Sequence, residues 1–549
     1  MMPEMIMPLL QGALIALCLV HATFQTLHYV HMLQLNSYRP ERYLQWLRES
    51  DKRSLPATRL LGAAPLAILM MFGFYGDVWA YIAYGVALAL ELIATVFDRP
   101  RKAKKPLVYT PRVKRLLVTL ALITAILLAL SVLLPMMMHA IRDAAGAEDW
   151  DLSGLTADRV LAAMLLLIVL LPALMVSFAN KVNGPIERHI AKGFTNDAKR
   201  ILSEMKDLTV IGITGSYGKT STKNFLTALL SVKYNVLMTP ESYNTPMGVV
   251  RTVRERLRAS HEIFICEMGA KNKGDIREIC EIVHPQHGMI TAIGEQHLET
   301  FGTIETIIDT KFELADALPE DGMAVLNFDN EYIAARDVDG VKTVSYGLYD
   351  GAAYTAKDIT VDESGSTFTV YAPNGESCEY TTRLLGAHTI QNLVGCVAMA
   401  HQLGIALSDL KAPIRQMKPV EHRLQLLPNG YIDDAYNSNP AGFRSALDVL
   451  GAMQNTRRVL VTPGMVELGK RQKALNKELG EYAATRCDIA VLVGEKQAPP
   501  LKAGLLRGGF DEERIFVATD LHQAISYVQS LPPVERQIVL LENDLPDNF

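Results

Sequence analysis

The 549-residue chain is 49% hydrophobic and 21% charged, and its formal net charge at pH 7 is −5. A chain of this length holds roughly three or four domains, and its mean hydropathy of +0.13 is high for a soluble protein, so we expect part of it in a membrane. The acidic balance gives little support to nucleic-acid binding by phosphate neutralisation. The six cysteines are scattered, which argues against a disulfide framework or a structural zinc site.

The long apolar runs lie in the first 180 residues and predict membrane-crossing helices. Two of them, 116–138 and 160–178, carry no charge and approach the ~20 residues that cross a hydrocarbon core. For the closely spaced second and third runs, a re-entrant pair is the alternative. A cleaved signal peptide is a weaker interpretation of the first run, because no basic segment precedes it. The sequence predicts an all-α multi-pass bundle over 1–180 with about five helices: 5–30, 60–75, 78–97, 116–138 and 159–178.

The loops between these runs predict how the bundle is oriented. Residues 31–59 hold six Lys or Arg against three acids, and residues 98–115 hold eight against one, so both loops should be cytoplasmic. Residues 139–158 hold one Arg against five acids and should be external. Five spans with the N-terminus outside satisfy every loop. The chain from about residue 180 onward is then expected on the cytoplasmic side of the cell membrane, where ATP is.

Four polar residues interrupt the apolar runs. His21, His28 and His31 share one helical face by spacing, and Glu91 is an acid within a predicted span. Ionisable groups inside a membrane suggest a functional site. The alternative, which we favour, is that these histidines and the glutamate lie near the membrane interfaces.

A phosphate-binding loop is predicted after the apolar run Thr209–Thr214. The sequence G-S-Y-G-K-T-S follows, and a helical pattern continues over Thr222–Leu230. Glycines between a strand and a helix let backbone N–H groups surround phosphate oxygens, while a lysine contacts the β and γ phosphates and a threonine hydroxyl ligates Mg²⁺. Ile213 stands where the general NTPase motif has its first glycine. The predicted nucleotide-binding residues here are Gly215, Ser216, Gly218, Lys219, Thr220 and Ser221.

The loop T-G-S-Y-G-K-T-S resembles that of the Mur ligase family, which also lacks the first glycine. Further segments resemble family motifs in the family's order over residues 209–495, and their joint order makes chance negligible. These segments are C-E-M-G-A at 266–270, Q-H-L-E-T-F-G at 296–302, K-F-E at 311–313, L-N-F-D at 326–329, G-A-H at 386–388 with Asn392, E-H-R at 421–423 and D-D-A-Y-N-S-N-P at 433–440. The last is similar to the MurF subfamily, which adds D-alanyl-D-alanine to a muramyl tripeptide.

This resemblance implies an α/β fold in two parts. The central ATP-binding domain is expected over 209–417 and a Rossmann-like C-terminal domain over 418–549, with 181–208 as a connector. Alternating strands and helices in the C-terminal part agree with a sheet carrying crossover helices. Its predicted strands are Arg458–Thr462, Ile489–Gly494, Arg514–Ala518 and Gln537–Leu541.

The family's reaction is ATP-dependent amide ligation through an acyl phosphate, and it implies roles for four residues. Lys219 would contact the phosphates, and Glu267 would hold one Mg²⁺ together with Thr220. His297 and Lys311 would hold a second Mg²⁺, provided that Lys311 is carbamylated and so becomes an anionic ligand. Taken alone, Lys311 would be read as a solvated helix lysine.

The resemblance also implies how the nucleoside is held. Asn392 would read the adenine edge with help from Asn327, while Arg423 and Asp434 would reach phosphate and ribose from the C-terminal domain. His388 is about as well explained as a structural histidine.

Two features of substrate recognition depart from the family. The predicted membrane bundle stands where soluble members have a UDP-sugar-binding domain, and the end of the chain reads L-E-N-D from Leu541 where MurF-type ligases have K-G-S-R. The leading hypothesis is a membrane-anchored ligase of peptidoglycan synthesis that joins an amino acid or dipeptide to a small-molecule or lipid-linked envelope precursor. Other envelope-synthesis proteins are candidate partners. The alternatives are a polyglutamate-type ligase, an ATP-binding regulatory module for the membrane bundle and a generic P-loop NTPase.

Overall fold

A computed structural model divides the chain into two compact units, Met1–Ala191 and Lys192–Phe549. The predicted spans 60–75 and 78–97 lie almost wholly outside the residues that the structure describes, and Glu91 and His297 lie outside them as well. The described residues are 2–54, 86, 89, 106–146, 157–240, 243–295, 298–362, 365–435, 439–466, 468, 471–494 and 498–543.

The N-terminal unit is helical, and its helices meet in a small apolar core. Tyr29, Tyr43, Leu116 and Val176 are buried together there, and the Tyr43 hydroxyl donates a hydrogen bond to the Ala173 carbonyl at 3.1 Å. His21 on the first helix is also fully buried, and its interfacial placement stays a prediction. The helices are α1 (Met2–Leu35), α2 (Pro40–Ser54), α5 (Pro111–Ala145), α6 (Ala157–Leu170) and α7 (Pro172–Glu204).

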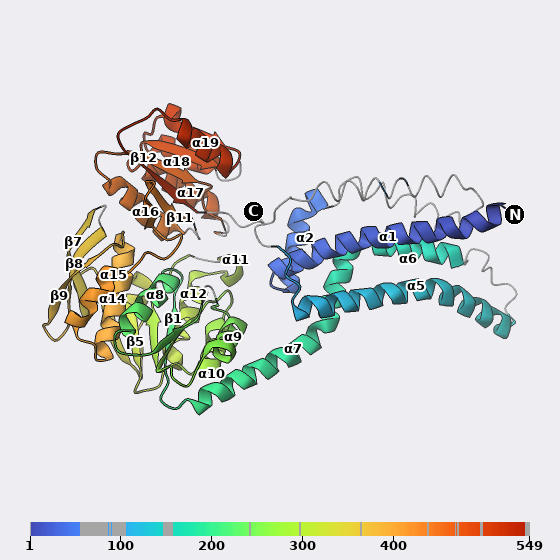
Figure 1. Ribbon diagram of the computed structural model, residues 1–549, viewed down its shortest axis with the longest axis horizontal. Coiled ribbons are helices and arrows are strands. Elements are labelled where there is room, and N and C mark those ends of the chain that lie inside the picture. Colours follow the sequence, from blue (N-terminus) through green and yellow to red (C-terminus); the bar gives the residue numbers. More distant parts are fainter. Residues whose placement is uncertain are drawn as a thin grey trace. The chain divides into compact units, whose positions relative to one another are not determined.

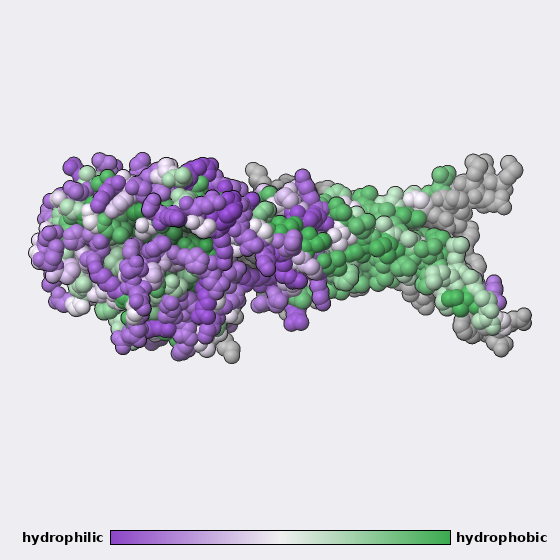
Figure 2. All heavy atoms as spheres, turned by 90° about the horizontal axis from the view of Figure 1, so that it is seen from below, coloured by the Kyte–Doolittle hydropathy of each residue, from purple (hydrophilic) through white to green (hydrophobic). Residues whose placement is uncertain are grey.

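Among the described residues, α5 is the helix that is long and apolar enough to cross a membrane, and the bent pair α6–α7 counts as a second if it forms one span. The side chains of Val118, Leu122 and Ile126 on α5 are about 60% exposed, and Figure 2 shows apolar surface gathered over this unit. The predicted helix 159–178 is broken at Leu171 with a bend of 83°. Pro172 explains the break, because proline lacks an amide hydrogen and disfavours helical backbone in the residue before it. The five-span bundle is therefore not confirmed.

The second unit begins with a nine-stranded sheet in the order β2-β3-β1-β4-β5-β6-β7-β8-β9. The strands from β2 to β7 pair in parallel, and β7, β8 and β9 pair antiparallel at one edge. The strands are β1 (Thr209–Thr214), β2 (Val236–Met238), β3 (Ile263–Glu267), β4 (His287–Ile290), β5 (Met323–Asn327), β6 (Lys342–Gly347), β7 (Tyr354–Asp362), β8 (Gly365–Tyr371) and β9 (Ser377–Thr382).

Helices cover both faces of this sheet because its strands alternate buried side chains between two cores. On β1, Ile211 and Ile213 pack with α8 and α14, whereas Val210 packs with α9, α10 and α12 on the opposite face (Figure 1). The helices are α8 (Lys219–Leu230), α9 (Pro246–Arg256), α10 (Asp275–Val283), α11 (Leu298–Phe301), α12 (Ile304–Phe312), α13 (Glu331–Ala334), α14 (Ala387–Gln402) and α15 (Lys411–Gln416).

A six-stranded sheet follows in the order β10-β11-β15-β12-β13-β14, parallel except for β10 against β11. Leu460 packs on α16, α17 and α18, and Val459 packs on α19 at the other face. Together the two sheets confirm the expected α/β architecture. The elements are β10 (Gln425–Leu426), β11 (Tyr431–Asp434), α16 (Pro440–Ala452), β12 (Arg457–Thr462), α17 (Gln472–Ala483), β13 (Ile489–Val493), α18 (Ala498–Arg507), β14 (Ile515–Ala518), α19 (Leu521–Ser530) and β15 (Gln537–Glu542).

Candidate active site

The predicted phosphate loop joins β1 to α8 and depends on two glycines. Gly215 and Gly218 have φ of 149° and 81°, in the region that favours glycine. A Cβ on Gly215 would lie 2.2 Å from the Thr291 hydroxyl oxygen, and one on Gly218 would lie 2.8 Å from Asn392 Oδ1. The loop therefore closes tightly and leads into a helix N-terminus, which favours anions.

The lysine of this loop is held toward the loop backbone. Lys219 Nζ donates hydrogen bonds to the carbonyls of Gly215 at 2.7 Å and Ser216 at 3.2 Å. The pKa of Lys219 is lowered to about 8, chiefly by burial; the negative charge of Glu267 opposes this shift, and the positive charge of Arg423 adds to it. An anion bound in the loop would relieve the cost of keeping this ammonium charged.

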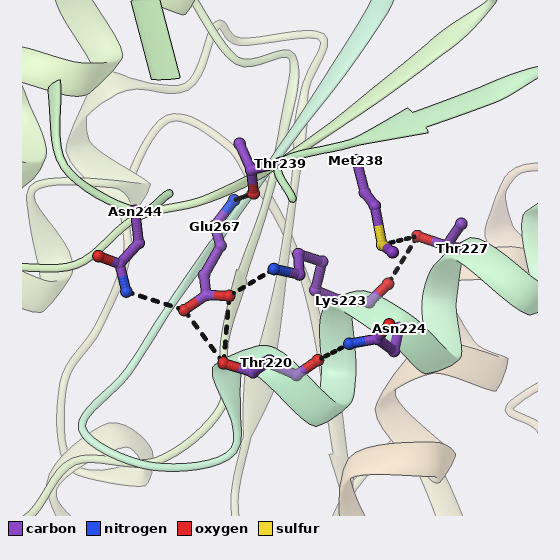
Figure 3. Close-up of polar contacts among 8 residues, drawn as sticks. All are labelled: Thr220, Lys223, Asn224, Thr227, Met238, Thr239, Asn244 and Glu267. Carbon is purple, nitrogen blue, oxygen red and sulfur yellow. Dashed lines mark hydrogen bonds and ion pairs between the residues drawn. The ribbon is translucent and has the colours of Figure 1, made fainter. Parts of the chain in front are cut away.

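Glu267 lies at the carboxyl end of β3, and its carboxylate is surrounded by hydrogen-bond donors (Figure 3). Its carboxylate accepts hydrogen bonds from the Thr220 hydroxyl at 3.2 Å and Asn244 Nδ2 at 3.0 Å, and it pairs with Lys223 Nζ at 2.9 Å. Burial would raise the pKa of Glu267, but the charges of Lys223 and Lys219 and these hydrogen bonds together hold it below its usual value. The carboxylate is therefore ionised at neutral pH.

Sequence analysis missed Lys223, whose side chain is only 1% exposed. It lies one helical turn after Lys219 on α8, and this spacing places both ammonium groups on one helix face. This spacing could have been read from the sequence, whereas the ion pair could not, because its partner Glu267 lies on β3.

The donors for a first Mg²⁺ fit the structure, because the Thr220 hydroxyl and the Glu267 carboxylate are adjacent oxygen ligands. Within the described ranges, no group of three His, Cys, Asp or Glu side chains that could hold a metal is found, and His297 lies outside those ranges. The second site therefore stays a prediction that rests on Lys311.

Lys311 itself is 3% exposed, so it is not the solvated helix lysine of the alternative interpretation. Burial, followed by the nearby charge of Lys219, holds the pKa of Lys311 well below its usual range. Its ammonium nitrogen lies 5.9 Å from the centre of the Phe301 ring. This shift favours the neutral amine, which is the form that can react with carbon dioxide.

A cavity of about 230 Å³ brings together the predicted nucleoside-binding residues. Asn327, Asn392, Arg423 and Asp434 all line it, as do His388, Tyr217, Gly218 and Ser221. Asn327 is partly committed to the fold, because its Nδ2 donates to the Thr291 carbonyl at 2.7 Å and its Oδ1 accepts from the amide of Asp329 at 3.1 Å.

Two carboxyl groups, from Asp434 and Glu542, lie together in the lining of this cavity. Asp434 on β11 is in register with Glu542 on β15, and Glu542 is 1% exposed. Burial raises the pKa of Asp434 to about 6, opposed by hydrogen bonds with Glu542 and with the amide of Leu424. Two carboxyl groups that occupy one buried site favour a state in which one of them keeps its proton. The sequence marked Glu542 only as a departure from K-G-S-R.

Comparison with known proteins identifies the class of protein that this fold and site define. A sequence model described as "Mur ligase middle domain" matches residues 213–400, and one described as "Mur ligase, glutamate ligase domain" matches residues 422–541. The chain belongs to the Mur ligase family, which confirms the prediction from the motifs.

Several of its relatives within the family are MurF-type. The UDP-N-acetylmuramoyl-tripeptide--D-alanyl-D-alanine ligase of Haemophilus influenzae is 32% identical over 306 residues, 54% of this chain and 66% of that protein. The Bacillus subtilis protein of the same name is 30% identical over 336 residues, 60% of this chain and 72% of that one. The crystal structure of MurF from Thermotoga maritima in complex with ADP superimposes with a TM-score of 0.58 at 25% identity, over 64% of this chain and 80% of that one. The chain thus spans just under two thirds of the Haemophilus protein.

Proposed function

We propose that this protein is an ATP-dependent ligase that forms an amide bond on a carboxylated cell-envelope precursor. The main support is that Thr220 donates a hydrogen bond to Glu267, that the charge of Lys219 acts on the same carboxylate, and that a cavity lined by Asn392 lies beside the loop. The names of the MurF-type relatives and the ADP bound to the Thermotoga protein support the same assignment.

The proposed reaction has two steps. An oxygen of the acceptor carboxylate attacks the γ phosphorus of ATP, the bond to the β-phosphate oxygen breaks and ADP leaves, giving an acyl phosphate. The nitrogen of an incoming amine then attacks the acyl carbon, inorganic phosphate leaves and the nitrogen loses a proton. Because carboxylate and triphosphate are both anionic, the first step requires positive charge at the point where they meet.

The residues of this chain supply part of that charge. Lys219 would contact the β and γ phosphates, and Lys223 keeps Glu267 ionised and in place. Thr220 and Glu267 would hold one Mg²⁺, and a carbamylated Lys311 would contribute to a second. Bound Mg²⁺ supplies further positive charge to the phosphate oxygens.

The acceptor and the amine are the finer part of the proposal. UDP-N-acetylmuramoyl tripeptide and D-alanyl-D-alanine are the first candidates because the relatives carry them in their names, and a lipid-linked precursor is the second. Purified full-length protein in detergent, supplied with Mg-ATP, should release phosphate only when the right acceptor and amine are both present. Mass spectrometry should then show an amide product. Acceptor-independent ATP hydrolysis without a product would favour the regulatory-module alternative.

We further propose that the N-terminal helices anchor the ligase in the cell membrane with its catalytic domains in the cytoplasm. The exposed apolar side chains of α5 support this anchoring, and the basic loop 98–115 supports the orientation. A reporter fused after Lys105 should be cytoplasmic, and one fused after Asp151 should be external. The opposite pattern would place the ATP site outside the cell and contradict the proposal.

A further inference from the structure

A second hollow in the ligase unit gathers basic side chains that the nucleotide site does not use. It lies against the edge strand β9, the helix α15 and the linking segment 417–425, with a volume of about 980 Å³. Among the described residues that line it, Glu379 is the acidic one. The basic residues that line it are Arg383, Lys411, Arg415 and Lys418.

These four side chains are exposed, and within the described part of the chain none has a hydrogen-bond or ion-pair partner. Some exposed arginines elsewhere in the unit do pair with acids, as in Arg251 with Glu255 at 2.9 Å and Arg200 with Glu204 at 2.7 Å. Four unpaired like charges around one hollow repel one another. An anion that entered the hollow would relieve this repulsion.

We propose that this basic hollow binds a ligand that carries a diphosphate or an equivalent cluster of phosphate charges. Arg383 and Arg415 offer planar guanidinium groups that suit phosphate oxygens, and Lys411 and Lys418 add point charges. The hollow adjoins the nucleotide cavity, since Pro419 lines both, but it shares none of the phosphate-loop residues. The ligand chemistry fits a soluble diphosphate compound or a phospholipid headgroup. The inference does not depend on the proposed ligase reaction.

The test is a calorimetric titration of full-length protein in detergent with inorganic pyrophosphate. A saturating non-hydrolysable ATP analogue blocks the phosphate loop first. Wild type should bind one equivalent of pyrophosphate, and added salt should weaken the binding. Lys411→Glu/Arg415→Glu should weaken it at least tenfold. The control Lys473→Glu/Lys477→Glu on α17 makes the same change in net charge at exposed positions and should bind as wild type does.

A second pair of variants guards against misfolding. If the first variant loses its thermal transition, Arg383→Gln/Lys418→Gln removes the other two charges without reversing them and should weaken binding in the same direction. Failure of wild type to bind pyrophosphate, or equal weakening in the α17 control, would overturn the site.

Mixed micelles separate the two sources of phosphate. Displacement of pyrophosphate by micelles doped with an anionic phospholipid, but not with a zwitterionic one, assigns the hollow to a headgroup. Pyrophosphate binding that neither micelle disturbs assigns it to a soluble diphosphate. Phosphate release measured in parallel reports on the ligase separately, because the substituted residues lie outside the nucleotide cavity.

Discussion

The candidate site has a phosphate end, formed by the loop after β1 and Glu267, and a nucleoside end, formed by the cavity that Asp434 and Glu542 line. The charged groups at the two ends are stabilised in different ways. At the phosphate end, Glu267 is contacted by donors from α8 and from the segment before α9, and the charge of Lys223 balances its own. At the nucleoside end, Asp434 and Glu542 place two acids side by side in the C-terminal domain. The first arrangement is fixed in one ionisation state at neutral pH, whereas the second changes its state near pH 6.

The difference separates two kinds of functional residue. The groups proposed to contact the triphosphate and a metal already lie together without any ligand, as electrostatic catalysis requires. The groups proposed to contact the sugar change their ionisation near pH 6, and at Glu542 the sequence also departs from the family's K-G-S-R. Four substitutions sharpen this comparison, two of them by ligase turnover and two by stability.

The largest effect is expected from Lys219→Ala at the phosphate end. Removing a charge that is proposed to contact the transferred phosphate should lower turnover at least ~100-fold, the scale of losing one donor to a transition-state anion. The fold should survive, because burial already makes the charged lysine costly. Turnover and thermal midpoint are the measurements, and Lys473→Ala is the control. Full activity in Lys219→Ala would show that the loop does not hold the phosphates.

Lys311→Ala should lose nearly all ligation while ATP still binds, because Lys219, Thr220 and Asn392 remain. If a carbamate on Lys311 completes a metal site, formate or acetate should partly restore the rate by occupying the vacated anionic position. Turnover is measured at saturating ATP with and without these carboxylates, alongside ATP affinity. Wild-type turnover in Lys311→Ala would contradict the proposed second metal site and favour the regulatory-module hypothesis.

Lys223→Met tests whether the phosphate end is balanced by a buried ion pair. Removing one partner should leave the Glu267 charge uncompensated and cost about 3–5 kcal/mol of stability. Lys223→Met/Glu267→Gln should recover part of this loss, as followed by the thermal midpoint. The control is Arg251→Met, which breaks an exposed pair and should change stability by no more than about 0.5 kcal/mol. Equal effects in the two single variants would mean that the pair is not buried in solution.

The phosphate loop could be predicted because its signals are local. A β-branched run, two glycines and a helical pattern lie within 22 residues, and the structure has β1 and α8 there. The pairing of Lys223 with Glu267 is tertiary, so a single sequence shows only the one-turn spacing on α8. The antiparallel edge of β7, β8 and β9 likewise carried no motif that sequence analysis used.

In the N-terminal unit, by contrast, a local signal was present in the sequence but was not used. Hydrophobicity predicted an unbroken helix over 159–178, but Pro172 was a visible local signal that ends α6. Apolar composition indicates which surface avoids water, and backbone chemistry decides where a helix stops. The burial of Lys311 was likewise readable only from the family's register, because its neighbours in sequence do not reveal a buried position.

The smallest expected effect concerns the nucleoside end and depends on pH. Because the folded-state pKa of Asp434 is raised to about 6, the folded protein binds this proton more tightly than the unfolded chain does. Stability from this group is therefore fully present below the unfolded pKa of about 4 and is lost as pH rises through about 6. Asp434→Asn keeps an acceptor for the amide of Leu424 and removes the titration. Its thermal midpoint should match that of wild type near pH 4.5 and exceed it at pH 7.5, while Asp448→Asn, at an exposed acid on α16, should show no such crossover. A constant offset between Asp434→Asn and wild type across this range would mean that the two carboxyl groups do not share a proton, and that the nucleoside end is as fixed in charge as the phosphate end.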